Sequence, residues 1–176
     1  ASDSTATLQL PVAGALLALV SNHVVQGRVG FPGAGYLETA RVAATTVADP
    51  ALRGVFFLQP LAVEAANLVV ACAVADGRFE VRSGADGASE DAAVHCSGAL
   101  TSLVQGLRVE HASVRAKVCV PASDIGALYD GFDAVGLQYG PGYRTLVQAW
   151  GGARDALARL RARSTHEGTQ VHPADL

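Results

Sequence analysis

One helical stretch with an alanine-rich face, followed by a series of short strand-like runs, is the feature that most limits how this chain can fold. In GAGYLETARVAATTVADP, residues 33–50, small and apolar side chains recur at steps of three and four residues, which predicts one face of a helix. That face carries Leu37, Ala40, Ala44 and Val47. Pro32 stands just before the helix, and Asp49-Pro50 is predicted to end it. Because the inner face is mostly alanine, a sheet could curl closely around this helix.

The runs after residue 50 read as strands separated by turn signals. They are GVFFLQPLAV, NLVVACAVADG, RFEVRSGADG, AAVHCSGALTSLV and SVRAKVCV, at intervals of roughly 10 to 15 residues. This spacing predicts an antiparallel sheet, and one helix followed by a meander of strands is an α+β arrangement. Before the helix, TLQLPVAGALLALV (residues 7–20) predicts one or two short strands around Pro11 and Gly14. HVVQGRVGF (residues 23–31) is also strand-like, with a glycine that could mark a bulge or a close approach.

The last third of the chain is predicted to add a second helix and more strand. The helical stretch is PASDIGALYDGFDAVGL, residues 121–137, with Ser123 or Asp124 as its N-cap. QYGPGYRTLVQAW then reads as turn and strand, GGARD as a turn, and ALARLRARS as strand. We divide the chain into a first unit of residues 1–112 and a second of residues 113–176.

The composition argues against several classes of function. The formal net charge is −3 and Lys and Arg do not cluster, so no nucleic-acid-binding surface is expected. The three cysteines, Cys72, Cys96 and Cys119, are scattered without CxxC spacing, which argues for a reducing compartment and against disulfides or zinc. The apolar run Leu10–Val20 is too short to span a bilayer and follows no basic segment, so neither a membrane span nor a signal peptide is expected. We expect a cytoplasmic protein and, since the chain contains no methionine, a piece of a longer one.

Five sequence elements resemble the landmarks of polyketide synthase dehydratase domains, in the same order. HVVQGRVGFP, residues 23–32, resembles their HxxxGxxxxP motif, and GAGYLETA resembles the start of their first helix. VHCSG (94–98) resembles an HxxG-like strand, LQYGPGYRTL the YGPxF element, and VHPADL (171–176) the opening of HPxxLDxxxQ. The resemblance covers nearly the whole chain. It implies a hotdog fold, in which an antiparallel sheet wraps around a central helix, with a complete first hotdog and only the beginning of a second.

One departure from the family concerns its second catalytic residue. In the family this is the aspartate after the leucine of HPxxLD, and here that leucine is Leu176, the last residue of the chain. Asp175 stands two places too early to match it. We interpret this as truncation of a longer chain rather than loss of the acid, and we expect this fragment alone to be inactive.

The resemblance implies a dehydratase that removes water from a 3-hydroxyacyl thioester to give a 2-enoyl thioester. The reaction needs a general base, and His23 is suited to that role because its unperturbed pKa, about 6.5, leaves it largely neutral and apolar neighbours would lower that pKa further. Backbone N–H groups of Gly33 and Ala34 at a helix N-terminus could stabilise charge on the thioester oxygen.

The substrate-binding wall and the partners are likewise implied by the resemblance. The YGPGY segment would line the acyl tunnel, with Tyr139, Gly140, Pro141 and Tyr143 as substrate-binding residues. The substrate would be carried on the phosphopantetheine arm of an acyl carrier protein, and neighbouring synthase domains would complete the parent synthase, expected to be a homodimer. No cofactor, metal, nucleic acid or membrane span is expected.

Other titratable residues are given structural roles. His95 is expected to bond a backbone carbonyl, and His172 to shape the second half of the site rather than to react. Exposed positions are expected for His111, His166, Asp130, Asp133 and Asp155. Two alternatives to the dehydratase stay open: a non-catalytic double-hotdog scaffold of a synthase, and an isomerase or product-template relative that keeps the fold and His23.

Overall fold

The computed structural model describes residues 6–44, 50–85, 92–102, 110–117, 121–152, 155–165, 167–169 and 171–175. The strands are β1 (Ala6–Pro11), β2 (Val24–Val25), β3 (Arg28–Val29), β4 (Pro50–Phe57), β5 (Val69–Ala75), β6 (Arg78–Gly84), β7 (Ala93–Ser102), β8 (Leu146–Gly151) and β9 (Ala156–Leu160). The helices are α1 (Gly14–Val20), α2 (Gly33–Ala43), α3 (His111–Lys117) and α4 (Ile125–Ala134), with a 3₁₀ turn at Pro173–Asp175. None of the described helices is long and apolar enough to cross a bilayer.

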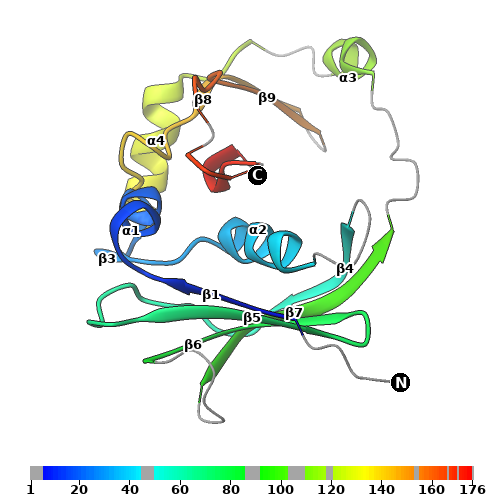
Figure 1. Cartoon of the computed structure of the whole chain (residues 1–176). Coiled ribbons are helices and arrows are strands. Elements are labelled where there is room, and N and C mark those ends of the chain that lie inside the picture. The colour runs from blue at the N-terminus through cyan, green and yellow to red at the C-terminus, as the bar shows by residue number, and fades with distance from the viewer. Residues whose placement is uncertain are drawn as a thin grey trace.

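A five-stranded antiparallel sheet carries α2 along one face (Figure 1). The strand order is β1-β5-β6-β7-β4, so β1 and β4 form its edges. Four of the predicted strand runs supply β4 to β7. The predicted alanine-faced helix is α2, but it ends at Ala43; residues 45–49 lie outside the described part, and Pro50 begins β4. The predicted α+β arrangement is therefore confirmed.

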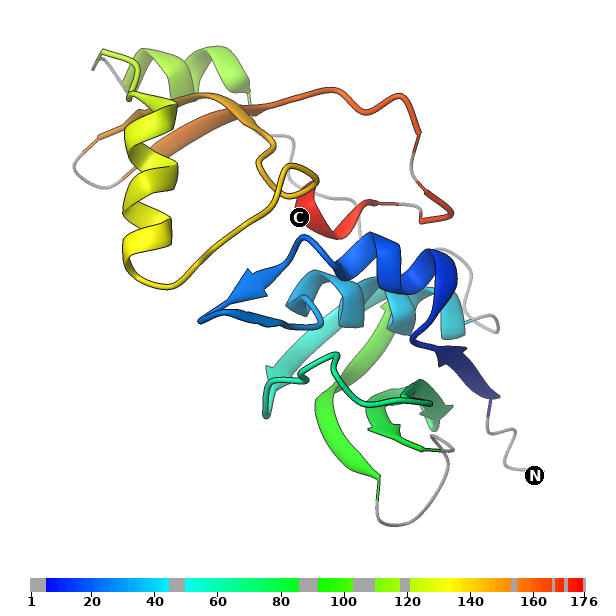
Figure 2. The same ribbon diagram turned by 90° about the vertical axis from the view of Figure 1, so that its left-hand side faces the viewer.

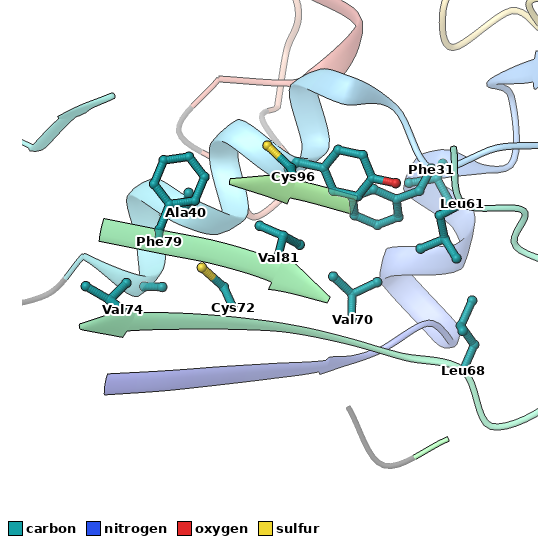
Figure 3. Packing of buried hydrophobic residues seen from close by; sticks show 13 residues of the cluster. Phe31, Ala40, Leu61, Leu68, Val70, Cys72, Val74, Phe79, Val81 and Cys96 are labelled. Atoms are coloured by element: carbon teal, nitrogen blue, oxygen red, sulfur yellow. The ribbon is translucent and has the colours of Figure 1, made fainter. Parts of the chain in front are cut away.

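The core lies between α2 and the sheet (Figure 3). Alternate residues of β5 and β6, among them Val70, Cys72 and Val81, point at the helix and are fully buried. Ala40 is fully buried on the facing side of α2, and its small side chain lets the helix axis approach the strands closely. The Phe79 ring covers its cross-strand partner Gly98, where a Cβ would lie only 2.7 Å from the ring.

Two segments predicted as strand are helical. Residues 14–20 form α1, because Gly14 turns the chain with φ +52° after β1 and the following ALLALV is composed of Ala, Leu and Val. Ala and Leu have high helix propensity, and the pairing of β1 with β5 ends at Pro11, before these residues. Residues 113–117 belong to α3 rather than to a strand, and residues 118–120 lie outside the described part.

The first glycine of HVVQGRVGF closes a hairpin turn rather than a bulge. Gln26 and Gly27 have φ angles of 51° and 75°, which is the two-residue turn that matches the twist of paired strands. The turn joins β2 to β3, which pair antiparallel. The hairpin begins immediately after His23, at Val24.

The second half of the chain packs over the exposed side of α2. Asp124 caps α4 as predicted, with its carboxylate accepting a hydrogen bond of 3.1 Å from the Ala127 N–H. The two predicted strands are β8 and β9, which pair antiparallel, and residues 153–154 of the predicted turn lie outside the described part. Figures 1 and 2 show the 3₁₀ turn Pro173–Asp175 between this hairpin and α2, which it contacts. The division at residue 112 stays a prediction.

Replacing Gly98 by alanine is expected to destabilise the chain. The new Cβ would overlap the Phe79 ring and approach the Arg53 carbonyl at 3.3 Å, so strand or ring must shift. Overpacking of this kind costs about 1–3 kcal/mol. Urea unfolding would measure the loss as a lower midpoint.

Gly151→Ala is the matched control, since its Cβ would meet nothing within 4 Å at the end of another strand. We expect it to change the free energy of unfolding by less than about 0.5 kcal/mol. Equal midpoints for the two variants would contradict the packing described for Phe79.

Candidate functional site

His23 lies in the turn between α1 and β2, where backbone hydrogen bonds fix it on both sides. Its N–H donates to the Val20 carbonyl at 2.9 Å, and its carbonyl accepts from the Gly30 N–H at 3.0 Å. The ring nitrogen Nδ1 lies 2.9 Å from the Gly30 carbonyl oxygen. A carbonyl oxygen only accepts, so this contact assigns the proton to Nδ1 and leaves the lone pair on Nε2.

The protonation state of His23 follows from its half-buried position. Burial lowers the pKa of His23 from its usual value because the charged ring would lose water. The bond to the Gly30 carbonyl opposes this effect but is the smaller cause. The imidazole is therefore neutral at neutral pH, with Nε2 able to accept a proton.

Two tyrosines of the YGPGY segment pack against the His23 ring. Tyr139 stacks on it with ring centroids 5.5 Å apart, and Tyr143 lies at 5.3 Å. Tyr143 also contacts His172 at 5.9 Å, so three rings run from His23 to the C-terminal turn. The Tyr143 hydroxyl is buried and has no hydrogen-bond partner among the described residues, and burial raises its pKa so that it stays a neutral donor.

The same segment is docked through its backbone onto the residues around His23. The Gly140 N–H donates to the Asn22 carbonyl at 2.8 Å, and the Gly142 N–H to Asn22 Oδ1 at 3.3 Å. A side chain at position 140 would overlap the Asn22 amide, so a larger residue there would force the Asn22 side chain to move. Gly140 and Pro141 thus position the two tyrosines.

The first turn of α2 begins three residues after the carbonyl that holds the His23 ring. Pro32 is the N-cap, and its carbonyl accepts the Gly35 N–H at 2.9 Å. Among the described residues, the N–H groups of Gly33 and Ala34 have no acceptor, as expected for the first positions of a helix. The Phe57 ring flanks Gly33, 3.3 Å from where its Cβ would lie. The roles predicted for Gly33 and Ala34 stay predictions.

The remaining histidines are buried structural groups where the structure describes them. His95 Nδ1 lies 3.2 Å from the Gln59 carbonyl oxygen, as predicted, and Nε2 lies 2.7 Å from the Ser83 hydroxyl. His172 is buried with Nδ1 accepting the Ala174 N–H at 3.1 Å. Residue 166, the side chain of residue 111 and Cys119 lie outside the described part. Asp130, Asp133 and Asp155 are exposed, as predicted.

One ion pair at the site was not predicted from the sequence: Arg163 with Asp175, which links the C-terminal turn to the YGPGY segment. Arg163 Nε lies 2.6 Å from Asp175 Oδ2, and Nη2 donates to the Gly142 carbonyl at 2.9 Å. Both side chains are mostly buried, with 15% and 19% exposed. Asp175 is therefore held by an arginine. The alternation in ALARLRARS, which puts Arg161 and Arg163 on one side, was the available signal. Arg161 also binds the segment, through the Pro141 carbonyl at 3.2 Å.

Two family descriptions match this chain. Residues 1–84 match the polyketide synthase dehydratase domain, and residues 108–176 match the polyketide synthase dehydratase N-terminal domain. Among curated relatives, polyketide synthase ThaG of Burkholderia thailandensis is 32% identical over 81% of this chain, and PksN of Bacillus subtilis is 26% identical over 88%. The chain spans only 3% of each of these large proteins.

Solved structures share the fold over almost the whole chain. The dehydratase domain from the CurK module of curacin polyketide synthase has a TM-score of 0.81 at 21% identity, covering 97% of this chain and 64% of that one. A trans-AT polyketide synthase dehydratase domain from Brevibacillus brevis has a TM-score of 0.79 at 26% identity, covering 98% and 66%. The chain thus spans about two thirds of the length of these domains, and the predicted hotdog fold is confirmed.

The fold, the HxxxGxxxxP stretch that contains His23 and the two family matches all lead to the same family. The chain belongs to the polyketide synthase dehydratase domain family.

Proposed function

We propose that this chain carries the base-bearing half of a dehydratase that converts a 3-hydroxyacyl thioester to a 2-enoyl thioester. The single observation that supports this most is the state of His23: a half-buried ring with Nδ1 bonded to a carbonyl and Nε2 left as an acceptor. A neutral imidazole of this kind is suited to remove an α-proton at neutral pH.

In the proposed reaction, Nε2 of His23 takes the α-proton and the electrons of the C–H bond move to the thioester carbonyl. The N–H groups of Gly33 and Ala34 would stabilise the charge on that oxygen, because the N-terminus of a helix offers free donors and a positive dipole end. The double bond then forms as the bond from the 3-carbon to oxygen breaks, and the departing hydroxide takes a proton and leaves as water.

The acid for that last proton is proposed to come from beyond the described residues. By its resemblance to the family, the acid would be an aspartate immediately after Leu176. Asp175 is a poor candidate, since Arg163 holds one carboxylate oxygen at 2.6 Å. Tyr139 and Tyr143 would form the wall beside the reacting carbons, which their contacts with His23 support.

The substrate is proposed to arrive on the phosphopantetheine arm of an acyl carrier protein, without a further cofactor or metal. The relatives are large polyketide synthases, which supports neighbouring synthase domains as partners. A homodimeric parent synthase and a cytoplasmic location remain part of this proposal.

Replacing His23 by glutamine is expected to abolish the base while keeping a polar side chain. In a domain extended to the length of the solved dehydratases, we expect kcat for dehydration of a 3-hydroxyacyl thioester to fall by about 10²- to 10⁴-fold. Formation of the enoyl thioester, followed by its ultraviolet absorbance, would measure this.

Arg28→Gln is the matched control on the same hairpin, because Arg28 is exposed and, in the described part of the chain, pairs only with Glu64. It should keep the rate within about twofold. A wild-type extended domain that dehydrates none of a set of 3-hydroxyacyl thioesters would instead favour the scaffold alternative.

The pH profile of kcat/KM is expected to carry an acid limb set by His23. Protonated His23 cannot act as a base, so activity should rise with pH through the pKa of the ring, and burial places that pKa below 6.5. Tyr139→Ala would expose the ring and move the limb to higher pH. An acid limb that does not respond to Tyr139→Ala would count against His23 as the titrating group.

The 176 residues alone are expected to bind acyl thioesters without dehydrating them, because the proposed acid is not among them. Mass spectrometry after prolonged incubation with a 3-hydroxyacyl thioester would detect any enoyl product. Turnover by this chain alone would show that the acid lies within it.

A further inference from the structure

A buried histidine on β7 binds the loop that leads from β4 back to the segment beside His23. This histidine, His95, is 3% exposed, and Ser83 on β6 is 7% exposed. His95 Nδ1 lies 3.2 Å from the Gln59 carbonyl oxygen, and Nε2 lies 2.7 Å from Ser83 Oγ. Because a carbonyl oxygen only accepts, Nδ1 carries the proton and Nε2 accepts the serine hydroxyl. The ring therefore donates to the backbone of the loop.

The loop that His95 holds is short and stiff. It begins directly after β4, where the Leu58 N–H donates to the His95 carbonyl at 2.8 Å. Pro60 follows Gln59, so φ is fixed at Pro60 and Gln59 is restricted to extended backbone. The next residue, Leu61, is buried in the core. The position of Gln59 therefore determines where the Leu61 backbone lies.

The Leu61 backbone orients the carbonyl that holds the His23 ring. The Leu61 carbonyl accepts the Phe31 N–H at 2.8 Å, while the Gly30 carbonyl oxygen lies 2.9 Å from His23 Nδ1. The Gly30 carbonyl and the Phe31 N–H belong to one planar peptide unit and point in opposite directions. Leu61 and His23 thus hold this unit from its two sides. A shift of the Leu61 carbonyl would turn the Gly30 carbonyl away from the ring.

A stack of rings links His95 to the same peptide unit by a second path. The Tyr36 ring of α2 lies over the His95 ring, with centroids 6.0 Å apart and planes 7° from parallel. Tyr36 also stacks on Phe31, with centroids 5.0 Å apart. Tyr36 and Phe31 are both buried, so this stack is closely packed. The loop and the ring stack both lead from His95 to the Gly30–Phe31 peptide.

From these observations we propose that His95 is a positioning residue for His23. By holding the Gln59 carbonyl it fixes the Gly30–Phe31 peptide, and through that peptide the orientation and the Nδ1–H tautomer of the His23 ring. His95 is too deeply buried to meet substrate, so it acts through the backbone. The expected effect on dehydration rests on the proposed function, whereas the effect on the tautomer does not.

Two substitutions at position 95 separate the two hydrogen bonds of the ring. The side-chain amide of asparagine reaches the place of Nδ1, so His95→Asn can still donate to the Gln59 carbonyl. The amide of glutamine reaches the place of Nε2, so His95→Gln keeps a contact with Ser83 and loses the one with Gln59. Both variants replace a buried ring by a smaller side chain, and urea unfolding would compare their losses of stability.

The tautomer of His23 can be measured in the 176-residue chain by nitrogen NMR of its imidazole. In the wild type and in His95→Asn, Nδ1 should be the protonated nitrogen at neutral pH. In His95→Gln, the shifts of the two ring nitrogens should move toward each other as the Nε2–H form becomes populated.

Gly98→Ala is the control for lost stability alone. Its new Cβ would overlap Phe79 and approach the Arg53 carbonyl, and it would meet no residue of the loop. This variant lies on the same strand as His95 and should leave the His23 shifts unchanged.

Kinetics of the extended domain supply the second readout. For the 3-hydroxybutyryl thioester of N-acetylcysteamine, His95→Gln should lower kcat at least about tenfold with KM changed by less than about threefold, because a misplaced base slows the reaction more than it weakens binding. His95→Asn should restore kcat to within about threefold of the wild type. Equal losses of kcat in the two variants would show that His95 only supports the fold.

Ser83→Ala replaces His95→Gln if that variant does not fold. It deletes one oxygen, the donor that keeps Nε2 of His95 an acceptor, and should move the His23 shifts in the same direction by a smaller amount. Unchanged His23 shifts in whichever of these variants folds would overturn the positioning role. If the extended domain dehydrates nothing and the shifts still move, the proposed function fails and the positioning role stands.

Discussion

The backbone bonds between residues 22–26 and residues 136–142 are the constraint on which the site depends. Gln26 donates to the Gly136 carbonyl at 2.7 Å and Gln138 to the Val24 carbonyl at 2.9 Å, so a short ladder joins the two halves of the chain. Because each of these bonds joins one main-chain donor to one main-chain acceptor across the two segments, the register is fixed by the backbone itself. Side chains then follow: Tyr139 and Tyr143 can reach the His23 ring only in this register.

The second constraint is the fit of α2 on its sheet. Alanine at positions 40 and 43 keeps the helix close, and the Phe79 ring fills the space left by Gly98 on the neighbouring strand. This packing fixes the direction in which the helix begins, and therefore where its first N–H groups point. The proposed base and the expected oxyanion donors belong to separate elements, and Gly30 connects them, since its carbonyl holds the ring and its chain leads into Pro32.

Sequence patterns predicted the parts of this structure that rest on local periodicity. The alanine-faced helix, the strands β4 to β7 and the Asp124 cap each follow from residues within one element. The prediction of a strand for GALLALV was wrong because a short apolar run fits a strand as well as a helix. Only the tertiary context, here the end of the β1–β5 pairing at Pro11, decides between them. The family motifs located His23 and the YGPGY segment. The alternation in ALARLRARS marks the arginines, but it does not give the partner of Arg163, since the pair with Asp175 depends on how the chain folds back between two residues 12 positions apart.

The two segments that meet at the junction lie far apart in the sequence, and this separation sets the order in which the structure assembles. Asn22 and Gly142 are 120 positions apart, whereas the whole five-stranded sheet uses residues before position 103. During synthesis the sheet and α2 can therefore form while the YGPGY segment is still within the ribosome, since non-local contacts close last. In that interval the imidazole of His23 lacks its tyrosine cover and is open to water. The half-buried environment of His23, the proposed base, is thus acquired late, when the second half of the chain docks.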